Sequence, residues 1–167
     1  MEITLRSEEP KDYQQVREIL CSAFPTDAES KLVDVLRGNG KAIVSLVAVK
    51  DDEVLGHILF SPVSTSPPSE AKGIGLAPVA VKPAFQSQGI GSQLIREGLH
   101  RCMELKYAYV VVLGAPDYYE RFGFDKASRY GLQNEYGVDD EFMVIKFSDG
   151  EVCGLVKYAS EFAMFSV

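Results

Sequence analysis

One stretch of this sequence, residues 79–91, constrains the fold more than any other. It begins with a short apolar run, continues through a Lys-Pro turn, and ends at two closely spaced glycines, Gly89 and Gly91. Residues 88–106 then carry apolar or small side chains at spacings of three, four and seven, which indicates an amphipathic helix. The stretch therefore predicts a strand, a tight turn and a long helix, in that order.

The start of this helix has the properties of an anion site. A helix N-terminus presents four backbone N–H groups without an acceptor inside the helix, and the helix dipole favours a negative charge there. Gly89 and Gly91 have no side chain, so a pyrophosphate can approach the main chain closely. The Gly-x-x-x-x-Gly-Lys-Ser/Thr loop of NTPases is absent, and Leu94 replaces the third glycine of the dinucleotide fingerprint. We expect a phosphorylated cofactor of another class.

Strand and helix patterns alternate along the chain. Apolar, β-branched runs predict strands over residues 3–5, 42–49, 54–60, 74–81, 108–113, 142–147 and 152–158, with another starting at Phe124. Helical spacing predicts a helix opened by residues 9–12, a second through residues 32–36, and a short one over residues 116–121. Residues 50–53 predict a hairpin turn and the Pro- and Ser-rich residues 61–72 a loop. Pro78, inside a strand, indicates a bulge or an unpaired stretch. The pattern predicts an α/β class with a mixed sheet, in a single domain over residues 1–167.

Composition limits the compartment and the partners. Of the 167 residues 46% are hydrophobic, yet no apolar run approaches the roughly 20 residues that a membrane span needs. The N-terminus lacks a signal-peptide pattern, and three widely spaced cysteines suit a reducing compartment, so we expect a cytoplasmic protein with no membrane partner. A net charge of −7 argues against nucleic acid, and favours either a cationic acceptor or mere solubility. Two histidines argue against a His-rich metal site, so we expect no metal.

Two motifs resemble a known family. Residues 86–91, Gln-Ser-Gln-Gly-Ile-Gly, match the Gln/Arg-x-x-Gly-x-Gly/Ala signature of the GCN5-related N-acetyltransferase (GNAT) superfamily. Downstream, residues 119–124, Tyr-Glu-Arg-Phe-Gly-Phe, are similar to the family's Tyr-x-x-x-Gly-Phe. Residues 113–119, Leu-Gly-Ala-Pro-Asp-Tyr-Tyr, resemble a subgroup of uncharacterised predicted bacterial acetyltransferases. The order of elements is also similar to the family's over nearly the whole chain.

The resemblance implies a fold and an activity. The fold would be a mixed, mostly antiparallel central sheet with splayed central strands and flanking helices. The activity would be that of an N-acetyltransferase, which moves the acetyl group of acetyl-CoA to a primary amine of a small molecule or peptide by direct attack in a ternary complex. No metal would take part.

The resemblance also implies site residues. The backbone of Val79 and Val81 would pair with pantetheine, and the pyrophosphate would lie on the loop that comprises Gln86, Ser87, Gln88, Gly89, Ile90, Gly91 and Ser92. Tyr119 would donate a proton to the departing thiolate. Tyr118 is the alternative donor, because neighbours on a helix point about 100° apart and only one of the two can face the thiol.

Departures from the family leave the general base open. Many relatives carry a glutamate where this chain has Leu76-Ala77-Pro78, so a water chain or a carboxylate such as Asp27, Glu29 or Glu135 would take that role. His57 is either a base near neutral pH or a satisfied sheet residue. The family's frequent asparagine at the end of the central strand is also missing, because Val112 and Leu113 stand there.

Three further alternatives stay open at this point. The acyl donor could be longer than acetyl. The chain could be a non-catalytic acyl-CoA sensor or scaffold. It could also be a dinucleotide-binding oxidoreductase, although the missing third glycine argues against that alternative. The apolar C-terminus, residues 162–167, allows a homodimer without requiring one.

Overall fold

The computed structural model describes residues 2–165, which form two compact units. The first holds Met1–Phe60, Ala77–Gly98 and Glu161–Val167, and the second holds Ser61–Leu76 and Leu99–Ser160. Strands β3 (Glu53–Ser66) and β4 (Gly73–Val81) and helix α3 (Ile90–Glu104) each contribute residues to both units. The single domain over residues 1–167 stays a prediction.

The first unit is built on an antiparallel ribbon of β1, β2 and β3. β1 pairs with β2 from Thr4↔Val49 to Ser7↔Leu46, and β2 pairs with β3 from Val44↔Phe60 to Lys50↔Glu53. The predicted hairpin turn is confirmed. The elements of this unit are β1 (Thr4–Ser7), the 3-10 helix η1 (Pro10–Asp12), α1 (Tyr13–Ala23), α2 (Ala28–Gly38), β2 (Val44–Lys50), β3 (Glu53–Ser66, to Phe60), β4 (Gly73–Val81, from Ala77), η2 (Pro83–Phe85), α3 (Ile90–Glu104, to Gly98) and α5 (Glu161–Met164).

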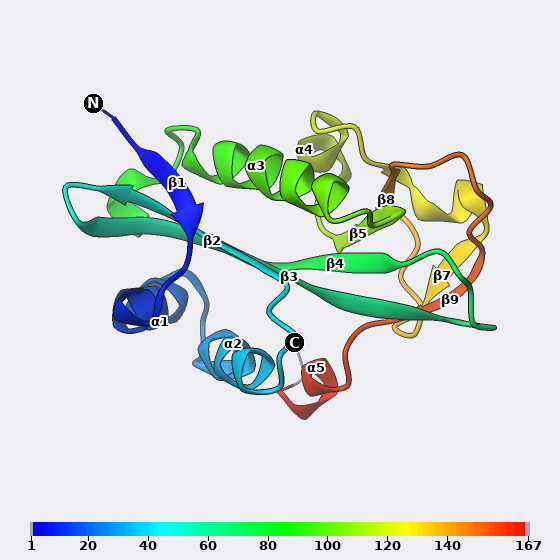
Figure 1. The fold of residues 1–167 in the computed structure, drawn as a ribbon, viewed down its shortest axis with the longest axis horizontal. Coiled ribbons are helices and arrows are strands. Elements are labelled where there is room, and N and C mark those ends of the chain that lie inside the picture. The colour runs from blue at the N-terminus through cyan, green and yellow to red at the C-terminus, as the bar shows by residue number, and fades with distance from the viewer. Residues whose placement is uncertain (1, 166–167) are drawn as a thin grey trace. The chain divides into compact units, whose positions relative to one another are not determined.

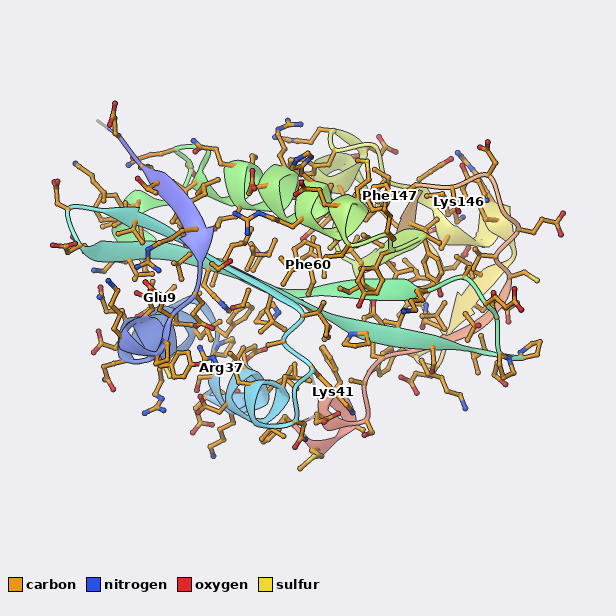
Figure 2. The ribbon with its side chains drawn as sticks, viewed as in Figure 1. Glu9, Arg37, Lys41, Phe60, Lys146 and Phe147 are labelled. Carbon is orange, nitrogen blue, oxygen red and sulfur yellow. The ribbon has the colours of Figure 1, made fainter. Side chains whose placement is uncertain are left out.

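Helices cover both faces of this ribbon. Figure 1 shows α1, α2 and α5 on one face of β2 and β3, with α3 on the other. The contact with α3 is close, because a Cβ added at Gly98 would lie 2.2 Å from Phe60 Cε1. Similarly, a Cβ at Gly56 would lie 3.0 Å from Leu94 Cδ1. Figure 2 shows Phe60 in this layer. Two glycines, Gly56 and Gly98, thus let α3 pack closely against the ribbon. Gly56 also lies close to Ile90, the first residue of α3, so this contact positions the start of the helix.

The second unit combines two sets of strands. β5 pairs in parallel with β4 from Gly73↔Tyr109 to Gly75↔Val111, and antiparallel with β8, which also pairs with β6. The far end of β3 pairs antiparallel with β9, and β9 pairs in parallel with β7, which lies beside it in Figure 1. The elements are β5 (Tyr109–Leu113), α4 (Pro116–Glu120), β6 (Asp125–Lys126), η3 (Ala127–Tyr130), β7 (Leu132–Asn134), β8 (Phe142–Lys146) and β9 (Gly154–Lys157).

The predicted fold class is confirmed: the sheet is open, mixed and mostly antiparallel, and helices flank it. One expectation was wrong, because residues 61–66 form strand and not loop. Their partners explain it, since Ser64, Thr65 and Ser66 pair with β9, about ninety residues later in the chain. β7 and α5 were not predicted. Pro78 lies inside β4 after a cis peptide bond, and the bulge there stays a prediction.

Two further findings concern residues 2–165 alone. No helix in this range combines the length and the hydrophobicity that a bilayer crossing needs. The same range contains no group of three or more His, Cys, Asp or Glu arranged for a metal ion. At the C-terminus Phe162 is buried in α5, while residues 166–167 of the predicted dimer segment lie outside the described residues. The homodimer stays a prediction.

Candidate functional site

The loop that follows β4 is folded back onto the end of its own strand. The Lys82 N–H donates to the Leu55 carbonyl at 2.8 Å, which holds the end of β4 against β3. Gln86 Nε2 then donates to the Val81 carbonyl at 3.1 Å, across the turn that η2 makes. Residues 86–89 are exposed, and α3 begins immediately after them at Ile90. The first unit therefore brings Val79, Val81 and the whole predicted loop to one end of β4.

The backbone of this loop is shaped by two left-handed residues. Ser87 has a φ of 64° and Gly89 a φ of 86°, a conformation that glycine adopts without the penalty other residues carry. A Cβ added at Gly89 would meet nothing within 4 Å, so the surface there is open. The glycine is needed for the backbone angle, and the space beside it can take a ligand group.

The start of α3 offers backbone donors at this open surface. The Gln93 N–H donates to the Gly89 carbonyl at 3.0 Å, which makes Gly89 the residue from which the helix starts. The N–H groups of Ile90, Gly91 and Ser92 precede this bond, so they lack acceptors within the helix. α3 has 15 residues, long enough for its dipole to add a favourable field for an anion. The donors and the open space fit a pyrophosphate.

Tyr119 lies in the second unit, in the short helix α4. The residue is only 8% exposed, and its ring packs edge-on against Phe124 with centroids 5.7 Å apart. Gly114 makes room for the ring, because a Cβ there would lie 2.2 Å from Tyr119 Cε2. Burial, with a smaller contribution from Tyr118, raises the pKa of Tyr119 to about 12. The hydroxyl therefore holds its proton at neutral pH and can act as a donor.

Tyr118 has different surroundings. It is half-buried, and the Arg121 guanidinium carbon lies 4.8 Å from its ring centroid. Its ring meets Tyr119 edge-on at 5.1 Å and Phe122 at 5.2 Å. Of the two neighbours, Tyr119 is the one that α4 turns into the interior of the unit.

His57 is a buried residue of the sheet, although its Nδ1 has no hydrogen-bond partner among residues 2–165. It is fully buried, and its Nε2 lies 2.9 Å from Ser45 Oγ. Ser45 Oγ also donates to Glu8 Oε1 at 2.9 Å, and Glu8 forms an ion pair with Arg37. Burial, and then the charge of Arg37, lower the pKa of His57 to about 3. The imidazole is uncharged and enclosed, so its contacts are those of a structural network that joins α2 to the ribbon.

The three candidate carboxylates differ in their contacts. Asp27 pairs with Lys31 at 3.2 Å on an exposed turn, and Glu29 is half-buried in α2. Glu135 is exposed, and its Oε1 accepts the backbone N–H of Tyr158 at 3.1 Å. Sequence reasoning did not find Tyr158, because no motif marks it. Gly114 belongs to the run of residues 113–119, but nothing in that run indicates that this glycine makes room for the Tyr119 ring.

Comparisons with known proteins identify the family of the chain. The sequence model described as "Acetyltransferase (GNAT) family" matches residues 13–124. An uncharacterized N-acetyltransferase of Escherichia coli, YhbS, is 38% identical over 166 residues, which cover 96% of this chain and 99% of that protein. The solved structure of YhbS, a complex with CoA, superposes with a TM-score of 0.91 over 98% of this chain and 93% of its own, at 36% identity.

A second solved structure extends the comparison. A GNAT acetyltransferase from Brucella melitensis, in complex with acetyl-CoA, superposes with a TM-score of 0.83 at 34% identity. The match covers 96% of this chain and 98% of that one. The family model and these full-length likenesses lead to one conclusion: the chain belongs to the GNAT family of acetyltransferases.

Proposed function

We propose that this acetyltransferase moves the acetyl group of acetyl-CoA to a primary amine of a small molecule or peptide, by direct attack in a ternary complex. The observation that carries the proposal is the exposed loop of residues 86–89, with left-handed Ser87 and Gly89, at the start of α3. The CoA and acetyl-CoA complexes of the two similar structures support the same donor.

In this proposal the chain holds acetyl-CoA mainly through its backbone. The N–H groups of Gly89, Ile90, Gly91 and Ser92 would bind the pyrophosphate, and Val79 and Val81 would pair with the pantetheine amides. The N–H of Val79 would also polarise the thioester carbonyl. A fixed donor there stabilises the developing oxyanion without reorganisation.

The chemical step needs one proton donor at the sulfur. A neutral amine attacks the thioester carbon, a C–N bond forms, and the C–S bond breaks with its electron pair on the sulfur. Tyr119 would protonate this thiolate, and the proton that the amine loses would pass to water. The raised pKa of Tyr119, caused mainly by burial, means that the hydroxyl carries its proton at neutral pH. After the transfer the tyrosinate would take a proton back from water, which restores the donor.

Calorimetry with acetyl-CoA tests the binding half, with NAD and ATP as ligand controls. Gly89→Glu would place a carboxylate where the pyrophosphate would lie. Because the two anions repel each other, we expect the acetyl-CoA affinity of this variant to fall by about 100-fold or more. Gly40→Glu is the matched control, because Gly40 is also left-handed, at φ 71°, with nothing within 4 Å of a built Cβ. Equal acetyl-CoA affinity of the two variants would overturn the assignment of the loop.

Thiol release with an amine panel tests the chemical half. The panel holds monoamines, diamines, amino acids and short peptides. We expect Tyr119→Phe to lower kcat by about 100-fold or more with acetyl-CoA affinity retained, because it removes only the proton donor. Tyr118→Phe, the neighbouring control, should keep kcat. The reverse pattern would exchange the roles of the two tyrosines.

An acyl-CoA-binding sensor or scaffold is the alternative function. The feature in its favour is the run Leu76-Ala77-Pro78, where many relatives carry a glutamate. Binding of acetyl-CoA without turnover of any amine in the panel would favour this alternative.

A further inference from the structure

We propose that the cavity at the start of strands β4 and β5 binds a small carboxylic acid with an aromatic body, and that Tyr109 and Lys72 hold its carboxylate. All the residues that carry this inference line one cavity and lie in the second unit. No step of the proposed acetyl transfer uses them, so the inference does not depend on that function.

The cavity has the size and the walls of a small-molecule site. Its volume is about 560 Å³, and pockets for small organic ligands usually have volumes of about 300–1,000 Å³. Apolar wall residues are contributed by β3 and the segment after it, Pro62, Val63 and Pro68, and by the start of β5, Tyr107 and Tyr109. Proline and tyrosine rings offer flat apolar faces, so the walls suit an aromatic body.

Strand pairing holds these walls in place. Gly73 and Tyr109 are partners in the first pair of the parallel ladder between β4 and β5. The Ala108 N–H donates to the Lys72 carbonyl at 2.8 Å, which extends this contact by one residue. The same end of β3 pairs with β9. The cavity is therefore formed mainly by paired backbone and not by a loose loop.

The Tyr109 hydroxyl is a polar group at the cavity without a partner. The residue is 1% exposed, and within residues 2–165 its hydroxyl makes no hydrogen bond. The oxygen lies over Gly73, because a Cβ built there would be 2.4 Å from it, and both residues line the cavity. Burial raises the pKa of Tyr109 to about 12, so the hydroxyl keeps its proton at neutral pH. Buried polar groups normally have partners, so this donor indicates a ligand acceptor.

Lys72 supplies the only formal charge among the described residues that line the cavity. Its side chain is exposed, and no acidic side chain of residues 2–165 forms an ion pair with it. Lys41 and Lys126, in contrast, each pair with acidic side chains. Lys72 directly precedes Gly73, over which the Tyr109 hydroxyl lies, so its flexible side chain can reach an anion held there. The two groups thus favour a negatively charged ligand.

A carboxylate fits these two donors better than a phosphate or an ammonium group. None of the described lining residues is acidic, so a cationic ligand would find no counterion in the cavity. A phosphate carries more charge and is usually bound by several cations or by a helix N-terminus. A carboxylate carries one charge and accepts hydrogen bonds from both a hydroxyl and an ammonium group. The apolar walls require that the rest of the ligand is apolar.

The cavity lies away from the proposed proton donor of the same unit. β5 runs from Tyr109, at the cavity, to Leu113, and Gly114 follows against the ring of Tyr119. At about 3.3 Å per residue, the two ends of β5 are about 13 Å apart. A ligand held by Tyr109 is therefore separate from the thiolate that Tyr119 would protonate, and the site is an additional one.

Titration of the ¹⁵N-labelled protein with 3-phenylpropanoate, followed by NMR, tests the site. CoA is present in excess, so that the pyrophosphate loop is not a second anion site, and 3-phenylpropanamide is the neutral control of the same shape. We expect saturable shifts of the Gly73 and Tyr109 amide signals, with a dissociation constant on the order of 0.1–1 mM for a ligand of this size. The amide should bind about tenfold more weakly. If the protein does not bind CoA, the same titration without CoA decides the question.

Three variants assign the two donors. Tyr109→Phe keeps the ring and removes the hydroxyl, so the dissociation constant should rise about tenfold, typical of a lost hydrogen bond to a charged group. The Tm of the free variant should not fall, because the hydroxyl has no protein partner to lose. Lys72→Gln should raise the dissociation constant about threefold, as for an exposed ion pair. Lys106→Gln is the matched control, because Lys106 is exposed but does not line this cavity, and it should bind like wild type.

Four results would overturn the proposal. Without saturable shifts at Gly73 and Tyr109, the cavity holds only water. Equal affinity for the acid and the amide would exclude the carboxylate, and wild-type affinity in Tyr109→Phe would exclude the hydroxyl as its donor. An equal loss in Lys106→Gln and Lys72→Gln would show a general effect of surface charge. No readout requires turnover of an amine, so failure of the proposed acetyl transfer leaves this test intact.

Discussion

Replacement of Gly114 by alanine tests whether the position of the Tyr119 ring sets the rate. The built Cβ would lie 2.2 Å from Tyr119 Cε2 and 2.9 Å from Cδ2, whereas ordinary contacts begin near 3.4 Å. The ring must therefore move by about 1.2 Å to reach an ordinary contact distance. A displacement of about 1 Å at a reacting group costs on the order of 100-fold in rate. We expect kcat to fall about 100-fold, which is about 2.7 kcal/mol of transition-state stabilisation.

The backbone should tolerate this change. Gly114 does not have a left-handed φ, and its N–H donates to the Glu141 carbonyl at 2.9 Å, a bond that alanine keeps. The packing cost of one extra methyl group in a filled space is about 1–3 kcal/mol, which a stable domain survives. Thermal unfolding checks that the variant is folded, and calorimetry checks that acetyl-CoA binding is retained.

A double-mutant cycle separates the ring's position from any general damage. Once Tyr119→Phe has removed the hydroxyl, displacing the ring should cost little more, so Gly114→Ala should be nearly silent in that background. Gly38→Ala is the control, because a Cβ at Gly38 meets nothing within 4 Å. A kcat within threefold of wild type would refute the reasoning, and so would an equal loss in both backgrounds.

Two predictions concern stability. Glu161 is buried beside Lys41 and Asn39, whose hydrogen bonds, that of Lys41 first, lower its pKa to about 2. Because the pKa of Glu161 is lower in the folded state, its charge stabilises the protein above about pH 4.5, and this stabilisation is lost as the pH falls through about 2. Glu161→Gln should therefore cost about 1–2 kcal/mol of unfolding free energy at pH 7, after allowance for the half-exposed Lys41, and almost nothing below pH 2. Urea unfolding at several pH values measures this, and a pH-independent difference would contradict it. Gly98→Ala should gain about 1 kcal/mol of helix propensity but lose about 1–3 kcal/mol to the clash with Phe60. Adding Phe60→Leu should relieve the loss in Tm, and a variant at least as stable as wild type would show that the helix can shift.

The sequence predicted the elements that carry their own periodicity. α3 and β5 lie within two residues of their expected bounds, because an amphipathic stripe and a buried apolar run are local properties. Residues 61–66 were misassigned because proline and serine are local loop signals, while the pairing with β9 is a long-range contact. The three-residue β7 and the four-residue α5 are too short to have a period. These errors share one cause, since each element is stabilised by partners far away in the chain.

The same distinction separates the parts of the site. The loop of residues 86–92 could be predicted because its function requires glycine and a helix start in consecutive positions. Gly75 and Gly114 could not, because each is required by a tyrosine, Tyr158 or Tyr119, whose packing only the folded chain reveals. A glycine in the sequence indicates that a close contact is possible, but it does not indicate the partner.

The ion pairs of the structure show which acidic side chains are neutralised inside the protein. A net charge of −7 is equally consistent with a cationic acceptor and with mere solubility. In the structure many acids already have counterions inside the protein, as Glu8 has Arg37, Asp12 has Arg6 and Glu161 has Lys41. Those charges stabilise the fold and leave little field for a ligand. Glu135 and Glu141 have no such partner among residues 2–165, and Glu135 accepts only the backbone N–H of Tyr158. The charge that remains for a ligand is therefore not confined to one carboxylate.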